Sequence, residues 1–323
     1  MLLDVRIKLK SPTIIPSKRT REGYVKPLNY LPGSTIRGAV ISSLYVEGFL
    51  SDDDRKSEAK EPTILSSPAY PTVDGLKSYP PTPFVWKCKH CEEIYDQTRE
   101  CVEDVVKGRE PTFVNECEYC GLPTEPLYGK QLIVRQGKEL KEVNVNVFRL
   151  TSVGIDKRRY VSAKGMLFDY EAIEEGTEFW CRMRVPDNIE IEGLEIFIGR
   201  GVSRGFGHAV IKKVEEYNLR WKDNEILYAL SYTLPVKTLF TPYGTTIKVK
   251  KIYGRYKRVQ TGWDMEKSKL RPIVNAVEKG AIVIADFDKF KPEISAVGVP
   301  FELHGFWITG FNVLLPIFEY LEG

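Results

Sequence analysis

The sequence predicts an α+β protein built from two ferredoxin-like (RRM-like) units, the first of them interrupted by a cysteine-bearing insertion. Residues 3–9 alternate apolar and polar side chains, which is typical of a half-buried strand. Residues 35–48 carry one apolar face, which is typical of a helix. The strand-like segments that follow keep the order of a ferredoxin-like unit. With 323 residues, the chain is long enough for two such units.

The first unit opens with the strand at 3–9, and Ser34 is the predicted N-cap of the helix at 35–48. Further strands are predicted at 147–151, 177–185 and 209–211, with a short apolar segment at 194–198. A strand, a helix, a pair of strands, a short helix and a final strand together make up one ferredoxin-like unit.

Between these segments the pattern degenerates from residue 51 to about residue 146, where prolines, mixed charges and four paired cysteines occur. We interpret this stretch as an insertion rather than as core. The first unit then covers residues 1–220. A second, smaller unit is predicted over 221–323, with strands at 226–234, 281–285 and 313–315.

The composition is typical of a soluble globular protein, with 42% hydrophobic and 28% charged residues. No apolar run approaches the roughly 18 residues that a membrane span needs. Asp4 and Arg6 follow closely on the initial methionine, unlike the start of a signal peptide. We therefore expect a cytoplasmic protein with no membrane partner. The net charge of +3 does not by itself require a nucleic-acid partner.

Four cysteines form two C-x-x-C pairs, Cys88 with Cys91 and Cys117 with Cys120, and 25 residues separate the pairs. A two-residue spacer lets both thiolates of a pair reach one ion, so two pairs supply four tetrahedral sulfur ligands. We predict a structural zinc site, because four sulfurs leave no open position for catalysis. The alternatives are two disulfides, which are rare in the cytosol, or four unrelated thiols. His90 could replace one cysteine as a ligand.

The segment 199–207 (GRGVSRGFG) holds four glycines and two arginines. Glycines permit positive φ and close approach of the backbone to a ligand, and exposed N–H groups can then hold a phosphate. Arginines add charge and a planar stacking surface. We predict that this loop binds nucleic acid, and the alternative is a tight turn. The predicted contacts are Gly199, Arg200, Gly201, Ser203, Arg204, Gly205, Phe206 and Gly207.

This loop resembles the C-terminal glycine-rich loop of the RAMP superfamily, the repeat-associated mysterious proteins of CRISPR systems. Three other segments resemble RAMP motifs in the expected order. Residues 31–39 (LPGSTIRGA) are similar to its PGSSLRGA motif, 153–159 (VGIDKRR) to its IDR segment, and 163–171 (AKGMLFDYE) to its G-x-L-F-x-x-E stretch. The resemblance covers the first two-thirds of the chain. It implies RAMP domains and an RNA-binding subunit of a type III effector complex in antiviral defence.

The last third is similar to the second domain of the Csx-ten family, the Cas-five-group subunit of type III-D complexes. Residues 260–264 (QTGWD) and 270–272 (LRP) follow that pattern, whereas 278–281 (EKGA) depart from the usual strand entry. The chain also lacks an obvious final glycine-rich loop after Gly310. The resemblance implies a subunit that grips the 5′ end of CRISPR RNA and bridges the large subunit and the backbone subunits. These are the expected partners.

Basic runs supply the remaining predicted RNA contacts. Residues 248–258 hold six bases, no acid and two interleaved tyrosines, a mixture that suits phosphates and stacked bases. The alternative for this run is a solvated hairpin. Arg37, in the first turns of its helix, is interpreted as a phosphate contact or as a surface residue. The predicted contacts are Lys18, Arg19, Arg21, Arg37, Arg158, Arg159, Lys250, Lys251, Arg255, Tyr256 and Arg258.

We expect a binding subunit rather than an enzyme. The sequence has three histidines and no P-loop, metallohydrolase cluster or triad order. His208 could act as a general base on a ribose 2′-hydroxyl, but we interpret it as a strand-entry residue. Asp156 could support cleavage or could equally order its loop. The alternative functions are a CRISPR endoribonuclease and a target-RNA-cleaving backbone RAMP subunit.

Overall fold

The largest sheet lies in the first unit. The computed structural model describes residues 1–19, 25–111, 116–137, 139–156, 158–159, 161–219, 225–264 and 266–322. In this described part, neighbouring strands follow the order β11-β10-β6-β5-β14-β1-β16-β15, and β4 pairs with β14. The strands are β1 (Leu2–Leu9), β4 (Leu65–Ser66), β5 (Tyr70–Val73), β6 (Leu76–Tyr79), β10 (Leu132–Gln136), β11 (Glu139–Val143), β14 (Glu178–Arg184), β15 (Glu195–Phe197) and β16 (His208–Glu216).

Strand β1 lies between β14 and β16 and pairs antiparallel with both. Its alternating pattern buries Leu3, Val5, Ile7 and Leu9 against the core. These observations confirm the strands predicted at 3–9, 177–185 and 209–211. The predicted short helix is wrong, because residues 185–207, all of which are described, hold only β15 and a 3₁₀ turn.

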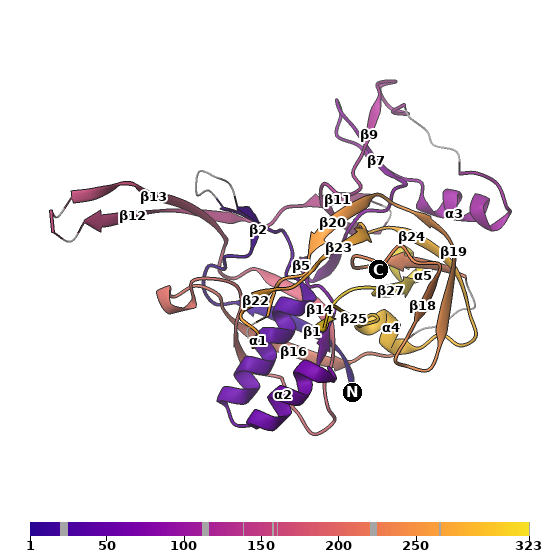
Figure 1. The fold of residues 1–323 in the computed structure, drawn as a ribbon. Helices are drawn as coiled ribbons and strands as arrows, with labels where there is room; N and C mark the ends of the chain where they lie inside the picture. The colour runs from indigo at the N-terminus through magenta and orange to yellow at the C-terminus, as the bar shows by residue number, and fades with distance from the viewer. Residues whose placement is uncertain are drawn as a thin grey trace.

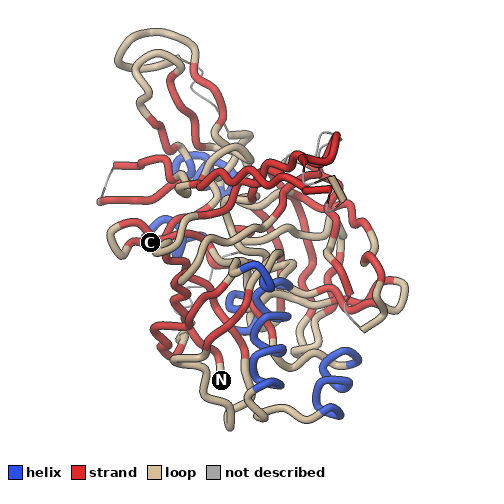
Figure 2. The backbone as a smooth tube through the Cα atoms, turned by 90° about the vertical axis from the view of Figure 1, so that its left-hand side faces the viewer, coloured by secondary structure: helices blue, strands red, loops and turns tan. Residues whose placement is uncertain are grey.

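Helix α1 (Gly33–Val46) packs its apolar face into the same core cluster as β1. It confirms the predicted helix but begins one residue before Ser34, so Ser34 is not the N-cap. Pro32 takes that place, because its extended backbone lets its carbonyl accept hydrogen bonds from Thr35 and Ile36. A Cβ at Gly33 would overlap the carbonyl oxygen of Ser66, so glycine is needed for this close approach. Helix α2 (Asp52–Lys60) lies beside α1 at the lower end of the molecule (Figures 1 and 2).

The stretch 51–146 differs from the predicted insertion. Strands β4, β5, β6, β10 and β11 all come from it, yet all join the large sheet. Ile64 and Tyr70 are fully buried. The prediction that this stretch lies outside the core is therefore wrong for these strands, because runs of two to five residues are too short to show a clear alternation. The domain boundary at residue 220 stays a prediction, since residues 220–224 lie outside the described part.

The cysteine-bearing part of this stretch forms its own three-stranded sheet, with β7 (Val85–Cys88) between β8 (Ile94–Asp96) and β9 (Thr124–Pro126). Helix α3 (Thr98–Val106) follows β8. In Figure 1 the sheet rises from the upper side of the molecule.

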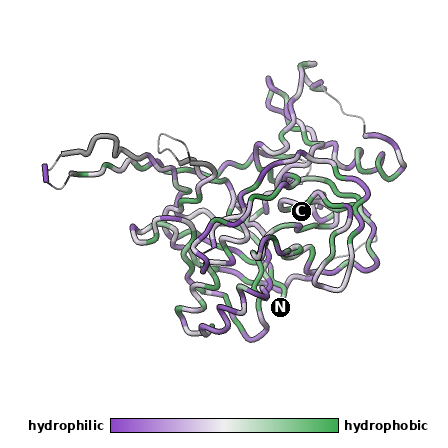
Figure 3. The backbone as a smooth tube through the Cα atoms, viewed as in Figure 1, coloured by the Kyte–Doolittle hydropathy of each residue, from purple (hydrophilic) through white to green (hydrophobic). Residues whose placement is uncertain are grey.

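A long hairpin of β12 (Val147–Asp156) and β13 (Val161–Ile173) projects to the left in Figure 1. Strand β12 contains the strand that was predicted at 147–151. At the base of the hairpin, β3 (Val25–Pro27) pairs with β13 and with β2 (Pro16–Arg19). The part of the tip that is coloured in Figure 3 is hydrophilic.

The second unit contains a sheet with the order β18-β19-β24-β17-β27. Strands β17, β24 and β27 confirm the predicted strands near 226–234, 281–285 and 313–315. The strands are β17 (Ile226–Ala229), β18 (Thr238–Phe240), β19 (Thr246–Tyr253), β24 (Ile282–Phe287) and β27 (Leu314–Pro316). The two-stranded pairs are β20 (Tyr256–Gln260) with β23 (Ile273–Val277), β21 (Trp263–Asp264) with β22 (Lys269–Leu270), and β25 (Phe301–Leu303) with β26 (Phe306–Ile308). Its helices are α4 (Pro292–Ala296) and α5 (Ile317–Glu322).

The two units share an apolar core. One cluster joins Tyr70 and Trp180 of the first unit to Tyr228 and Leu315 of the second. The hydroxyl of Tyr70 also donates to the carbonyl of Leu230 at 2.6 Å. The junction is therefore built like a protein interior. Within the described part of the chain, no helix is both long and apolar enough to cross a membrane.

Candidate metal centre and nucleic-acid interface

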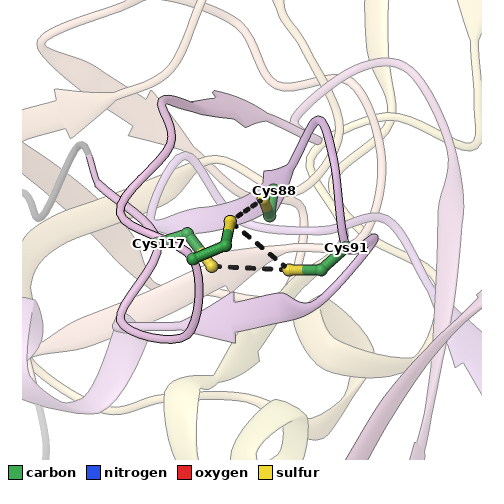
Figure 4. A group of neighbouring side chains, drawn as sticks. Cys88, Cys91 and Cys117 are labelled. Atoms are coloured by element: carbon green, nitrogen blue, oxygen red, sulfur yellow. Dashed lines mark hydrogen bonds between the residues drawn. The ribbon is translucent and has the colours of Figure 1, made fainter.

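The four paired cysteines converge on one point. The sulfur of Cys88 lies 3.4 Å from that of Cys120, and the sulfur of Cys91 lies 3.4 Å from that of Cys117. All four sulfurs lie within 4.8 Å of one another. Figure 4 shows the labelled side chains of Cys88, Cys91 and Cys117 pointing toward a common centre.

Two tight turns bring the sulfurs together. The residue after each pair has a positive φ, 61° at Glu92 and 67° at Gly121. In the first turn the N–H of His90 points at the sulfur of Cys88 at 3.4 Å, and in the second the N–H of Gly121 donates to the carbonyl of Cys117. The C-x-x-C spacing therefore forms two similar knuckles, one after β7 and one before β9.

This arrangement fits a tetrahedral metal ion. Ligands at about 2.3 Å from zinc lie about 3.8 Å apart, which falls within the observed range of sulfur separations. Separations of 3.4 Å are much longer than a disulfide bond of about 2 Å, so disulfides do not fit. The four cysteines can hold a metal ion compatible with zinc. His90 is exposed and outside the sulfur cluster.

Tyr95 is a partner of the site that sequence reasoning missed. Its hydroxyl lies 3.0 Å from the sulfur of Cys117. This hydrogen bond lowers the pKa of the Cys117 thiol to about 6 and so favours the thiolate form that binds metal. No spacing rule points to Tyr95, because β8 places it opposite Trp86 through strand pairing.

The glycine-rich loop adopts the positive φ values that its glycines permit, from 79° to 86° at all four positions. A Cβ at Gly199 would overlap the carbonyl oxygen of Ile14, and one at Gly207 would overlap that of Ile198. These two glycines let the loop approach neighbouring backbone. Gly205, by contrast, faces open space.

Most backbone N–H groups of the loop already have partners inside the protein. Those of Arg200 and Gly207 donate to the carbonyls of Ile14 and Pro12. Those of Arg204, Gly205 and Phe206 donate within the loop itself. The predicted phosphate cradle is therefore smaller than expected, because these bonds order the turn. In the described part of the chain, the N–H groups of Gly201, Val202 and Ser203 make no such bond.

The arginines of the loop do face solvent. Arg200, Ser203 and Arg204 are exposed, while Phe206 is buried beneath them. The guanidinium of Arg204 lies 5.1 Å from the ring centre of Tyr170, at the base of the projecting hairpin. Phe206 packs in a small cluster with Ile14 and Ala172. The loop thus presents its cations beside an aromatic ring, as single-stranded nucleic acid requires.

The basic side chains of 248–258 are less available to RNA than the sequence indicates. Lys250 contacts Glu225 at 2.9 Å and Asp286 at 2.6 Å, and Lys251 contacts Glu110 at 2.7 Å. Arg255 donates to the carbonyl of Tyr128. The acids come from distant segments, so they could not be read from the run.

Tyr256 and Arg258 remain exposed on one face of β20. The run spans β19 and β20, which pair with different neighbours rather than with each other. The predicted hairpin alternative is therefore wrong. Across the described residues, no hydrogen bond, ion pair or ring contact joins this run to the glycine-rich loop.

The prediction that Arg37 contacts phosphate is wrong, because its guanidinium is buried inside the protein. Nη2 contacts the Oε2 and the carbonyl of Glu58, both at 2.7 Å, and Nε donates to the carbonyl of Ile64 at 2.7 Å. The side chain ties α1 to α2. A motif arginine that was interpreted as a ligand contact is thus a structural residue.

Four further predicted contacts lie at the base or at the tip of the projecting hairpin. The backbones of Lys18 and Arg19 lie in β2 at its base, and Arg158 and Arg159 are exposed at its tip. Arg21 lies outside the described residues. Phe206 of the glycine-rich loop packs in one cluster with Leu150 and Tyr170 at the base of this hairpin.

His208 begins β16, which confirms its interpretation as a strand-entry residue. Its N–H donates to the hydroxyl of Ser11, and its ring stacks on Phe197 at 5.3 Å. Asp156 ends β12, some distance along the hairpin from its base.

Comparison with known proteins finds no matching family model and no matching curated sequence. Solved structures do match. A chain of the type III-B Cmr-beta complex, bound to cognate target RNA and AMPPnP, is 15% identical with a TM-score of 0.54, covering 87% of this chain and 86% of that one. A chain of the same complex bound to cognate target RNA has a TM-score of 0.53 with the same identity and coverage. The chain therefore shares the fold of a type III CRISPR subunit, as the RAMP resemblance implies.

Proposed function

We propose that this chain is an RNA-binding subunit of a type III CRISPR effector complex. The observation that carries the proposal is the shared fold over 87% of the chain with a subunit of an RNA-bound complex. The exposed cations of the glycine-rich loop, set beside Tyr170, supply chemistry that suits such a ligand.

The finer assignment rests on the sequence resemblance. As a Cas-five-group subunit, the chain grips the 5′ end of CRISPR RNA and bridges the large subunit and the backbone subunits. The Csx-ten pattern in the last third favours this position. Purification of the native complex from its host, with sequencing of the bound RNA, tests it. Recovery of CRISPR RNA together with the large subunit supports the assignment, and recovery of neither contradicts it.

Two exposed arginines test the RNA surface directly. We expect Arg204→Ala and Arg258→Ala each to weaken binding of a labelled single-stranded RNA, and the double variant to weaken it by about tenfold, because each removes a phosphate contact. Fluorescence anisotropy at several salt concentrations measures the affinity and its salt dependence.

The matched control is Lys289→Ala, which removes one exposed charge at the far end of β24. It should bind RNA like the wild type. If the double arginine variant also binds like the wild type, the proposed surface is wrong.

We further propose that the chain binds RNA without cutting it. A binding role requires no proton transfer from His208. This residue lies in a strand, and its ring stacks on Phe197. General acid–base help is worth about 10²–10⁴-fold in rate, so a nuclease would produce cleavage well above background. Labelled repeat RNA and target RNA should stay intact on a denaturing gel, with or without magnesium. Discrete cleavage that His208→Ala or Asp156→Ala abolishes would establish the endoribonuclease instead.

A further inference from the structure

Lys279 occupies an unusual position at the junction of the two units. Its ammonium lies 3.4 Å from the ring centre of Tyr30, just before α1, and 5.2 Å from that of Tyr232 in the second unit. Gly280 holds the turn in place, because its N–H donates to the carbonyl of Ala229. Its Cα lies so close to Pro81 that a Cβ at this position would overlap the carbonyl oxygen of Pro81. Lys279 is therefore held between two tyrosine rings by a rigid turn.

The neighbouring cations share one carboxylate that does not reach Lys279. Glu278 contacts Lys257 at 2.9 Å and Arg255 at 3.7 Å, and its side chain is buried. Lys257 lies in β20 and Arg255 directly precedes that strand, and both side chains point at Glu278. In the described part of the chain, no carboxylate lies within ion-pair distance of Lys279. The cluster thus sets three basic side chains against one carboxylate.

A half-buried ammonium without a carboxylate is unfavourable, because the rings displace water and cation–π attraction replaces only part of the lost hydration. Burial accordingly lowers the pKa of Lys279 to about 7. Glu278, which favours the charged form, and Lys257, which opposes it, are the charged groups that act on it. Lysine shifts its pKa readily when it is buried, and strongly perturbed pKa values cluster at functional sites.

We infer that Lys279, with Lys257 and Arg255, binds a phosphate group at the junction of the two units. A phosphate oxygen supplies the anion that the cluster lacks, and the partly exposed side chains of Lys257 and Arg255 leave it a path to the site. The phosphate belongs either to an RNA backbone or to a free nucleotide. The first source rests on the proposed function, and the second does not.

Proton uptake distinguishes this site from general attraction to positive charge. Above pH 7 Lys279 is mostly neutral in the free protein, so binding a phosphate must return its proton. Affinity for a labelled single-stranded RNA should therefore fall by about tenfold from pH 6 to pH 8.5 at constant ionic strength. Fluorescence anisotropy across this range measures it, with circular dichroism to confirm folding.

Three substitutions distinguish a phosphate site at Lys279 from general attraction of RNA to positive charge. Lys279→Met should bind more weakly at pH 6 and should lose most of the pH dependence. Lys279→Arg keeps the charge at every pH, so it should bind at pH 8.5 at least as tightly as the wild type. Lys289→Met removes a charge about 20 Å away, at the other end of β24, and should keep the wild-type pH dependence.

Competition identifies the source of the phosphate. If inorganic phosphate or ATP at millimolar concentration removes the Lys279-dependent part of RNA binding, the site also accepts free phosphates. If only unlabelled RNA does so, the backbone is the ligand. If Lys279→Met keeps the full wild-type pH dependence, the proposal is overturned. Salt-dependent RNA binding that persists in that variant would still leave the proposed function standing.

Discussion

Cys117→Ser is expected to release the metal and to unfold the small sheet of β7, β8 and β9. Cys117 is one of four converging sulfurs and accepts the hydrogen bond of Tyr95. Three remaining thiolates hold a structural zinc poorly, and in small zinc domains metal binding supplies about 10–16 kcal/mol of apparent folding free energy. Elemental analysis should find close to one zinc per chain in the wild type and much less in the variant.

The large sheet should survive this change, because its strands pair with one another and its main core cluster contains no residue of β7, β8 or β9. Circular dichroism and limited proteolysis should show a retained core with cleavage confined to about 88–120. Cys101→Ser is the matched control, since Cys101 is a buried thiol of α3 outside the cluster. A wild-type protein that is fully folded and free of metal would contradict the zinc site.

Arg37→Met is expected to be strongly destabilising without acting through RNA. The guanidinium of Arg37 contacts the buried carboxylate of Glu58 at 2.7 Å, and that carboxylate also accepts the N–H of Thr63. Removing one partner of a buried pair leaves an uncompensated charge, which costs about 3–5 kcal/mol. The free energy of unfolding, measured by denaturant titration, should fall by this amount.

An exposed pair nearby provides the control. Arg55 contacts Asp52 at 3.1 Å on the surface of α2, with more than half of each side chain exposed. Arg55→Met should therefore change the free energy of unfolding by less than about 1 kcal/mol. Adding Glu58→Gln to Arg37→Met should recover part of the loss, since it removes the unpaired charge. If Arg37→Met is as stable as the wild type but binds RNA poorly, Arg37 is a ligand contact after all.

Features carried by local pattern could be predicted from the sequence. The alternation of 3–9 predicts β1, because one face of a half-buried strand must be apolar. The spacing within each C-x-x-C pair predicts a knuckle, because a two-residue turn places both sulfurs on one side. Ordered motifs around the glycine-rich loop likewise implied the fold that the Cmr-beta comparison supports.

Features carried by distant partners could not be predicted. From the sequence Arg37 is interpreted as a surface cation, but in the fold α2 brings Glu58 into contact with it. Lys250 is likewise interpreted as available to RNA, but β24 places Asp286 beside it. The strands within 65–79 and 132–143 are too short to show a recognisable alternation in the sequence. Only their pairing with β14 and with one another places them in the sheet.

The sequence by itself thus determined the elements that carry a clear local pattern, the metal knuckles and the resemblance to RAMP proteins, since each depends on residues close together in the chain. Only the tertiary structure decided which charged side chains are available to a ligand. A cation with an acid from another element is neutralised, as Lys251 is by Glu110, whereas Lys279 is left beside two tyrosine rings without one. Coulomb energy depends on distance in space and on local hydration, and neither can be read from the order of residues without the fold.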